Sequence, residues 1–134
     1  MAEKTKQKGK KTTNMYARGI ERREKILSVA AQMIEEKDIR AISLKDIAGR
    51  TGVSVGAAYH FYANATDVFV ALAEQFMKSL RETIAAPYEG AATESWQALV
   101  ATAWGRGVEI YMECPAYQKL LLSGQTPPEI KQAD

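Results

Sequence analysis

Apolar residues recur at helical spacing along three stretches of the chain, and short polar segments separate these stretches. The spacing i, i+4, i+7 and i+8 predicts a helix over about 20–36, and similar stripes predict helices over about 66–86 and 94–113. No stretch shows sustained alternation of apolar and polar residues, so the sequence predicts an all-α protein. The stripes are Ile26, Ala30, Met33 and Ile34, then Val68, Phe69, Leu72, Phe76 and Leu80, then Trp96, Val100, Trp104, Val108 and Tyr111.

Between the first two stripes, the segment SLKDIAGRTGVSVGAAYHFY predicts two short helices joined by a tight turn. It begins with Ser43, which has the spacing of a capping box with Asp46. Gly52 can adopt the left-handed conformation that ends a helix. Ser54 is expected to cap a second helix over about 55–61. This arrangement is a helix-turn-helix, and the second helix of such a motif normally lies in a DNA groove.

The same segment resembles the DNA-binding domain of TetR-family transcriptional regulators, and the resemblance extends over about 22–77. The residues in register with the family pattern are Ile47, Ala48, Gly52, Val53, Ser54, Gly56 and Tyr59. The chain departs from the pattern at Thr51, at Ala57 and Ala58, and in the order of Phe61 and Tyr62. The family usually has a phosphate-binding lysine at the start of the next helix, where this chain has Ala65, Thr66 and Asp67.

The resemblance implies that Tyr59 donates its hydroxyl to a phosphate and that His60 contacts a phosphate or a base edge. Tyr59 could instead pack within the protein. Lys45 and Arg50 are candidates for contacts to the DNA backbone, and the alternative is that they are solvated surface residues. Val55, Ala57 and Ala58 offer no side-chain hydrogen bonds, so direct contacts to bases should be few and apolar, for example to thymine methyl groups. DNA shape would supply the remaining specificity. The candidate DNA-binding residues are Lys45, Arg50, Thr51, Ser54, Val55, Gly56, Ala57, Tyr59 and His60.

Beyond the helix-turn-helix, a Gly- and Ala-rich loop is expected at 88–93, a short helix from Pro115 to about Leu122, and a final turn capped by Thr126. Aromatic residues at helical spacing are usually core, but the family resemblance raises a ligand pocket as an alternative. The candidate ligand-binding residues are Trp96, Val100, Trp104, Tyr111 and Tyr117. Family members continue with further helices, so the resemblance implies a partial ligand domain here. We expect another surface, such as a second chain, to cover the aromatic stripe.

Charge divides the chain into two parts. Residues 1–62 carry 13 Lys and Arg against 7 Asp and Glu, and residues 63–134 carry 5 against 9. An excess of basic residues in the first part is expected of a protein that binds nucleic-acid phosphates with that part. Residues 1–14 contain five lysines and almost no apolar side chains, which predicts a disordered tail. This tail is interpreted either as solubilising or as a basic arm along the duplex.

Composition excludes several other functions. No apolar run approaches the roughly 20 residues of a membrane span, and a single cysteine, Cys114, fits a reducing cytoplasm and a packing role. His60 is the only histidine, so neither a histidine metal site nor a triad is expected. Phosphate loops and nucleophile motifs are absent from the sequence, which predicts neither an enzyme nor a cofactor.

The sequence therefore predicts a basic tail at 1–14, a helix-turn-helix domain at 15–64, and a connecting helix with a partial helical ligand-binding and dimerisation domain at 65–134. The implied function is that of a ligand-released repressor of TetR type. Its expected partners are a palindromic double-stranded operator, a second copy of the chain and a small apolar or aromatic inducer. The alternative is a truncated or non-DNA-binding interaction module that self-associates through its C-terminal half.

Overall fold

The computed structural model describes residues 2–86 and 94–122, and all of its regular elements are helical. No strand occurs in these two ranges, so the predicted all-α class is confirmed. The α-helices are α1 (Ala2–Glu36), α2 (Leu44–Thr51), α3 (Val55–Phe61), α4 (Ala65–Ala85), α5 (Trp96–Met112) and α6 (Pro115–Leu122), with a short 3-10 turn η1 (Ile39–Ala41). The loop expected at 88–93 and the turn expected at Thr126 lie outside the described residues.

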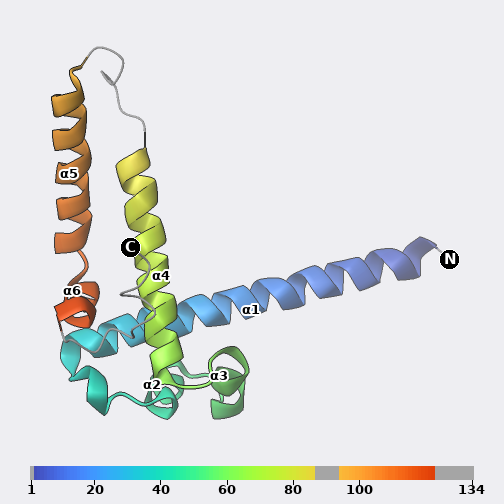
Figure 1. Ribbon diagram of the computed structural model, residues 1–134. Helices are drawn as coiled ribbons and strands as arrows, with labels where there is room; N and C mark the ends of the chain where they lie inside the picture. The colour runs from blue at the N-terminus through green and yellow to red at the C-terminus, as the bar shows by residue number, and fades with distance from the viewer. Residues whose placement is uncertain (1, 87–93, 123–134) are drawn as a thin grey trace.

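Helix α1 corrects the prediction for the N-terminal tail. The sequence predicted disorder over 1–14 and a helix from about Ile20, whereas α1 begins at Ala2 and runs without interruption to Glu36. Lys, Gln, Ala and Glu are good helix formers, and no proline interrupts this stretch. Because the packed part of α1 already provides the nucleus, each further turn adds hydrogen bonds without a new nucleation cost. The N-terminal half of α1 projects beyond the other helices (Figure 1).

The helices form two connected groups around the C-terminal half of α1 (Figure 1). Helices α2 and α3 lie beside α1, and α4 begins next to them and extends away. Helix α5 returns antiparallel alongside α4, and α6 closes against the C-terminal end of α1. The helix-turn-helix is thus held by α1 and α4, while α5 packs on α4 and α6.

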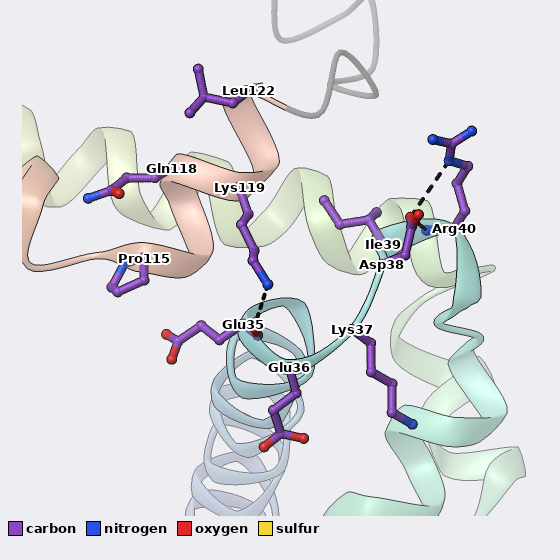
Figure 2. Close-up of a pocket in the computed structure, with 10 residues that line it drawn as sticks. All are labelled: Glu35, Glu36, Lys37, Asp38, Ile39, Arg40, Pro115, Gln118, Lys119 and Leu122. Atoms are coloured by element: carbon purple, nitrogen blue, oxygen red, sulfur yellow. Dashed lines mark hydrogen bonds and ion pairs between the residues drawn. The ribbon is translucent and has the colours of Figure 1, made fainter.

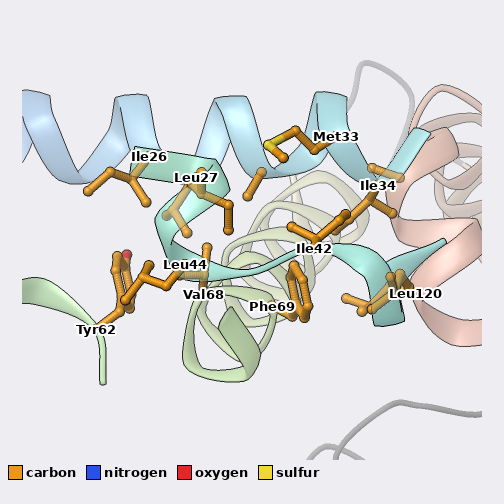
Figure 3. Packing of buried hydrophobic residues seen from close by; sticks show 14 of the residues in the cluster. Ile26, Leu27, Met33, Ile34, Ile42, Leu44, Tyr62, Val68, Phe69 and Leu120 are labelled. Carbon is orange, nitrogen blue, oxygen red and sulfur yellow. The ribbon is translucent and has the colours of Figure 1, made fainter. Parts of the chain in front are cut away.

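The core joins both groups through side chains from α1, α2, α4 and α6 (Figure 3). The predicted stripe of α1 is buried, as are Val68, Phe69 and Phe76 of α4. Ile39 and Ile42 of the connector are also buried. The largest fully buried side chains are Ile26, Met33, Ile34, Ile47, Leu120 and Val68.

Local signals set the ends of the helices in the helix-turn-helix. The Ser43 hydroxyl accepts from the Asp46 N–H at 3.1 Å, and the Asp46 carboxylate accepts from the Ser43 N–H at 3.0 Å, which completes the predicted capping box. Gly52 ends α2 with φ 76°, and Ser54 caps α3 by accepting from Ala57. Helix α3 finishes at Phe61, and Asn64 caps α4.

Candidate nucleic-acid interface

Helix α3 presents one polar and small-residue face to solvent. Val55, Gly56, Tyr59 and His60 are exposed at positions i, i+1, i+4 and i+5, and Tyr59 retains 55% of its accessible surface. Ala58, on the opposite face, is fully buried. Apart from the adjacent residues and the backbone of α3 itself, no heavy atom of the described residues lies within 4 Å of the place where a Cβ on Gly56 would stand. This face is therefore open to a large partner along its whole length.

The turn between α2 and α3 fixes the angle at which that face is presented. Gly52 and Val53 both donate backbone N–H groups to the carbonyl of Ala48, which closes α2. Thr51, predicted as a DNA-contacting residue, is instead 3% exposed, and its hydroxyl donates to the Ile47 carbonyl at 2.6 Å. A hydroxyl that satisfies its own helix can be buried without an unpaired polar group, so Thr51 belongs to the core of the motif.

Helix α1 anchors the far end of α3. The Arg23 Nε donates to the Tyr62 hydroxyl at 3.2 Å, and the Arg23 guanidinium lies 5.9 Å from the centre of the Tyr62 ring. This hydrogen bond raises the pKa of Arg23 further above its usual value. Tyr62 is buried while Phe61 is half-exposed, so the order Phe61-Tyr62 places the residue with a hydroxyl where Arg23 can satisfy it.

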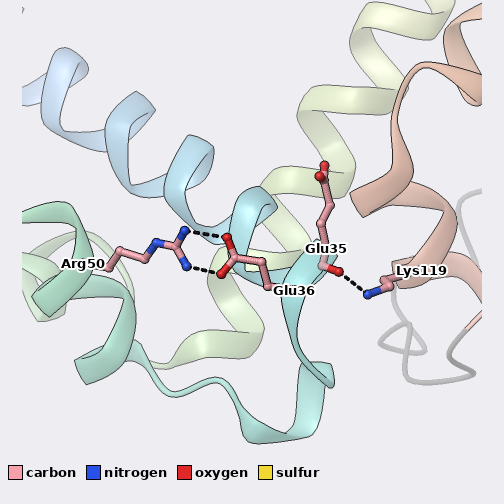
Figure 4. Close-up of polar contacts among 4 residues, drawn as sticks. All are labelled: Glu35, Glu36, Arg50 and Lys119. Carbon is pink, nitrogen blue, oxygen red and sulfur yellow. Dashed lines mark hydrogen bonds and ion pairs between the residues drawn. The ribbon is translucent and has the colours of Figure 1, made fainter.

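Arg50 is held by an ion pair within the protein. Its guanidinium donates to both carboxylate oxygens of Glu36, with Nη2 and Oε1 2.6 Å apart, at the end of α1 (Figure 4). Such a two-point pair lowers the pKa of Glu36 and raises that of Arg50. The predicted phosphate contact by Arg50 therefore competes with this pair, whereas Lys45 on α2 is exposed.

A basic cleft of about 750 Å³ separates the middle of α1 from the end of α3. Arg18, Arg22 and Arg23 of α1 line it together with His60 and Phe61 of α3. Sequence reasoning missed Arg18 because the helix was expected to begin only at Ile20, and it missed Arg22 because nothing in the sequence placed the middle of this helix beside the end of α3. Their i, i+4 spacing, which continues the register of α1, was the available signal.

Comparison with known proteins identifies this region. A sequence model of the family described as "Bacterial regulatory proteins, tetR family" matches residues 26–72. These residues form a TetR-family DNA-binding domain. The matched range covers the packed half of α1, the whole helix-turn-helix and the first turns of α4. The chain is thus a DNA-binding regulator of transcription. No curated protein shows significant similarity to it.

The TetR-type helix-turn-helix departs from the family pattern at the start of α4. Asn64 accepts from the Asp67 N–H at 2.9 Å, and Asp67 accepts from the Ala63 N–H at 3.1 Å. These residues cap α4 and place a carboxylate where the resemblance implies a phosphate-binding lysine. A negative charge at a helix N-terminus stabilises the helix but does not attract phosphate.

The five predicted ligand-binding residues are not brought together. Trp96, Val100 and Trp104 face solvent on α5, whereas Tyr117 is buried and Tyr111 is half-buried, with their rings 6.4 Å apart. Tyr117 also stacks on Phe76 at 3.7 Å, and burial raises the pKa of its hydroxyl. The sequence stripe divides because α6 folds back over the last turns of α5, where Gln118 donates to the Tyr111 carbonyl.

A second cleft, of about 760 Å³, lies between α6 and the connector that follows α1 (Figure 2). Charged residues line most of it, and the Lys119 ammonium donates to the Glu35 carbonyl across it. None of the five predicted ligand residues lines this cleft. This cleft is therefore not the aromatic pocket that the sequence raised as an alternative.

Other chemistry finds little support in the described ranges. Burial and the carboxylates of Glu113 and Glu35 raise the pKa of the Cys114 thiol, which favours its protonated, unreactive form. Within residues 2–86 and 94–122, no three His, Cys, Asp or Glu side chains gather in a way that could hold a metal ion. The same ranges contain no helix with the length and apolar character needed to cross a bilayer.

Proposed function

We propose that the protein is a sequence-specific regulator that lays α3 into the major groove of a palindromic operator and acts as a homodimer. The observation that carries this proposal is the exposed face of Val55, Gly56, Tyr59 and His60 on a helix whose two ends and opposite face are fixed by the fold. Helix α3 is about 10 Å long, which suits a major groove about 12 Å wide.

Each residue of that face has a role that follows from its chemistry. Gly56 lets the α3 backbone approach the DNA closely, and the Tyr59 hydroxyl donates to a phosphate. His60 contacts a phosphate or a base edge, and Val55 meets a thymine methyl group. The oxygen of Ser54 already caps α3, so its hydroxyl proton remains for a phosphate. Ala57 is half-buried and contributes its methyl group alone.

Phosphate contacts on both sides of α3 set the register of the protein on the duplex. Lys45 lies on α2, and Arg18 and Arg22 lie on α1 beside the end of α3. These cations fix position and affinity, while base contacts provide specificity. Arg50 contributes less than Lys45 because DNA must first displace the Glu36 carboxylate.

A two-fold dimer would place two α3 helices about 34–36 Å apart, one DNA turn, and this spacing is the reason for expecting a palindrome. We further propose that the protein is a cytoplasmic repressor released by a small apolar or aromatic ligand, which the TetR-type domain supports by resemblance. The aromatic group of Phe76, Tyr111 and Tyr117 is the interior position where such a ligand would act. The alternative of an interaction module is favoured by the solvent-facing side chains of α5.

Gly56→Glu tests the role of α3. The change puts bulk and negative charge at the closest approach to DNA, so binding to a pool of random-sequence duplexes should be lost while the helical circular dichroism signal persists. Gly56→Ala is the graded companion: the free protein has space for its methyl group and it adds no charge, so binding should fall less than with Gly56→Glu. Fluorescence anisotropy at two salt concentrations measures both. Normal binding by Gly56→Glu would show that another element enters the groove.

A further inference from the structure

One face of helix α1 carries positive charge along more than half of the helix. Its cations recur at positions i, i+4, i+7, i+14 and i+18, which all fall within an arc of about 80° on a regular helix. We call them the basic face of α1: Lys4, Lys8, Lys11, Arg18 and Arg22. The acidic residues of positions 2–25 lie about 100° or more from the centre of this arc. They are Glu3, Glu21 and Glu24, so the basic face is free of carboxylates over this stretch.

Contacts made by α1 show which side of the helix this face belongs to. Arg18 and Arg22 line the cleft that α1 shares with the end of α3. Glu36, whose position lies within about 40° of the centre of the basic face, pairs with α2 (Figure 4). Glu24, on the other side, lines a small cleft against α4. The register of α1 therefore places the basic face on the side of the helix-turn-helix and most of the carboxylates on the side of α4.

The N-terminal half of α1 carries the basic face past the end of α3 (Figure 1). From Lys4 to Arg22 the helix rises about 27 Å, which equals roughly eight base pairs of duplex at 3.4 Å per pair. The basic face thus begins beside the helix that enters the groove and continues beyond it. A row of cations without interspersed carboxylates is the charge pattern that fits a row of phosphates.

We propose that the basic face of α1 is a second DNA-binding surface, which holds the phosphate backbone of the duplex that flanks the groove entered by α3. Phosphate contacts carry no sequence information, so this surface adds affinity and lengthens the occupied site without adding specificity. Because its cations are mounted on a helix that is already formed, less chain entropy is lost on binding than with a disordered arm. This inference rests on the proposed function, since the flank is defined by the groove that α3 occupies.

The composition of the projecting stretch favours nucleic acid over a membrane surface as the partner. A helix that lies in the interface of a bilayer needs an apolar face to bury beside its cations. Residues 2–14 contain one apolar residue, Ala2, so they have almost nothing to insert into lipid. Phosphates along a duplex require only cations at the right places.

Two pairs of lysines in the same stretch provide a matched comparison. Lys8→Gln with Lys11→Gln removes two charges from the basic face, whereas Lys6→Gln with Lys10→Gln removes two from another side of α1. Glutamine is a good helix former, and circular dichroism checks that each variant keeps its helices. Fluorescence anisotropy with random-sequence duplexes at several salt concentrations gives the slope of log affinity against log salt. Each lost phosphate contact lowers this slope by about 0.9, so the first pair should make it shallower by about 2 per bound chain and the second should leave it unchanged.

Thr13→Pro tests whether the helix itself matters, because proline breaks the continuation of α1 and keeps every lysine. Its slope should fall toward that of the Lys8→Gln, Lys11→Gln variant, and an unchanged slope would overturn the helical surface.

The remaining outcomes separate this inference from the proposed function. Equal slopes for the two lysine pairs would overturn the basic face and leave binding through α3 standing, since Gly56→Glu judges α3 separately. Phosphatidylserine vesicles are the second probe. Vesicle binding that is lost with Lys8→Gln and Lys11→Gln, while the slope on duplexes is unchanged, would assign these lysines to a membrane and overturn the proposal. A wild-type chain that binds no duplex at all would overturn the proposed function together with this inference.

Discussion

The helix-turn-helix and helix α5 use apolar residues in opposite ways. In α2, every large apolar side chain turns inward, with Leu44 and Ile47 buried against α1 and α4. In α5, large apolar side chains are exposed on one side of the helix, which we call the outer face of α5, and the side facing α4 and α6 is only half-buried. The large residues of the outer face are Trp96, Val100, Trp104, Val108 and Met112. The apolar side chains of α2 are thus covered within the described chain, whereas α5 has apolar surface on two sides. A helix with apolar side chains on all sides is normally buried by neighbouring elements on all sides.

The difference separates stabilising contacts that form within the described chain from apolar surface that it leaves exposed. The caps, turn and buried stripe of the helix-turn-helix require nothing from outside the described residues, so this region supplies its own stability. The outer face of α5 contributes little to the folded chain, because its side chains are exposed both before and after folding. Equivalent substitutions in the two regions should therefore have unequal effects.

The largest expected effect comes from truncating a buried branched side chain. Ile47→Ala removes a fully buried residue of α2 and should destabilise the protein by about 2–5 kcal/mol. Val100→Ala, at a residue that is 58% exposed on α5, should change the free energy of unfolding by less than about 0.5 kcal/mol. Urea titration below the dissociation constant of any dimer compares the two. Equal losses would mean that the outer face of α5 is buried within one chain.

A glycine pair gives the next effect and compares the two sides of α5. Gly107→Leu forces a side chain against Ile84 and should cost about 1–3 kcal/mol of folding stability. Gly105→Leu meets open space, so the folded monomer should be unchanged or slightly stabilised by the better helix propensity. Thermal unfolding of dilute protein measures both. A destabilised Gly105→Leu monomer would place a neighbour from the same chain over that glycine.

The local signals of the helix-turn-helix made its fold predictable. Ser43, Asp46, Gly52 and Ser54 act within four residues of their partners, so their roles follow from spacing alone. The positions that prediction missed depend on distant contacts. Thr51 is buried because α2 lies against the core, and Arg50 is held because the end of α1 brings Glu36 to it.

The C-terminal half was less predictable for the same reason. Its helices were found from periodicity, but the stripe from Trp96 to Tyr111 was interpreted as one face. The position of α6, far along the chain from Trp96, decides that Tyr111 is covered while Trp104 is exposed. The start of α1 at Ala2 was missed as well. The composition of residues 1–14 indicates how little apolar surface they can bury, but it does not reveal that they continue a helix already formed by the residues after them.

Removing a helix cap should have a smaller effect, and its size should differ between the two regions. Ser43→Ala deletes the two capping hydrogen bonds of the hydroxyl, leaves the bond from the backbone N–H of residue 43 to Asp46, and should cost about 1–2 kcal/mol. Ser95→Ala deletes one longer hydrogen bond, 3.4 Å to the Ala98 N–H, and should cost about 0.5–1 kcal/mol. Chemical denaturation of both variants gives the comparison. A larger loss at Ser95 would show that α5 depends on its own first turn more than α2 does.

The smallest expected effect is a dependence of stability on pH that only the cap of α2 should show. Hydrogen bonds from the Ser43 hydroxyl and then from its backbone N–H lower the pKa of Asp46. A carboxyl whose folded pKa is below its unfolded value, ordinarily about 3.9, stabilises the fold above that value. This contribution is lost as pH falls through the folded pKa. The Ser95 cap has Ala98 at the equivalent position and no such carboxylate.

Asp46→Asn should therefore make the fall in stability below about pH 4 shallower, while leaving stability near neutral pH only slightly reduced. Glu36→Gln is the informative companion, because Arg50 lowers the pKa of Glu36 in the same direction and its loss should flatten the same part of the curve. Urea midpoints measured from pH 3 to 7 provide the test. Curves of identical shape for wild type and Asp46→Asn would mean that the unfolded chain keeps the Ser43–Asp46 contact, since linkage depends on the difference between the two states.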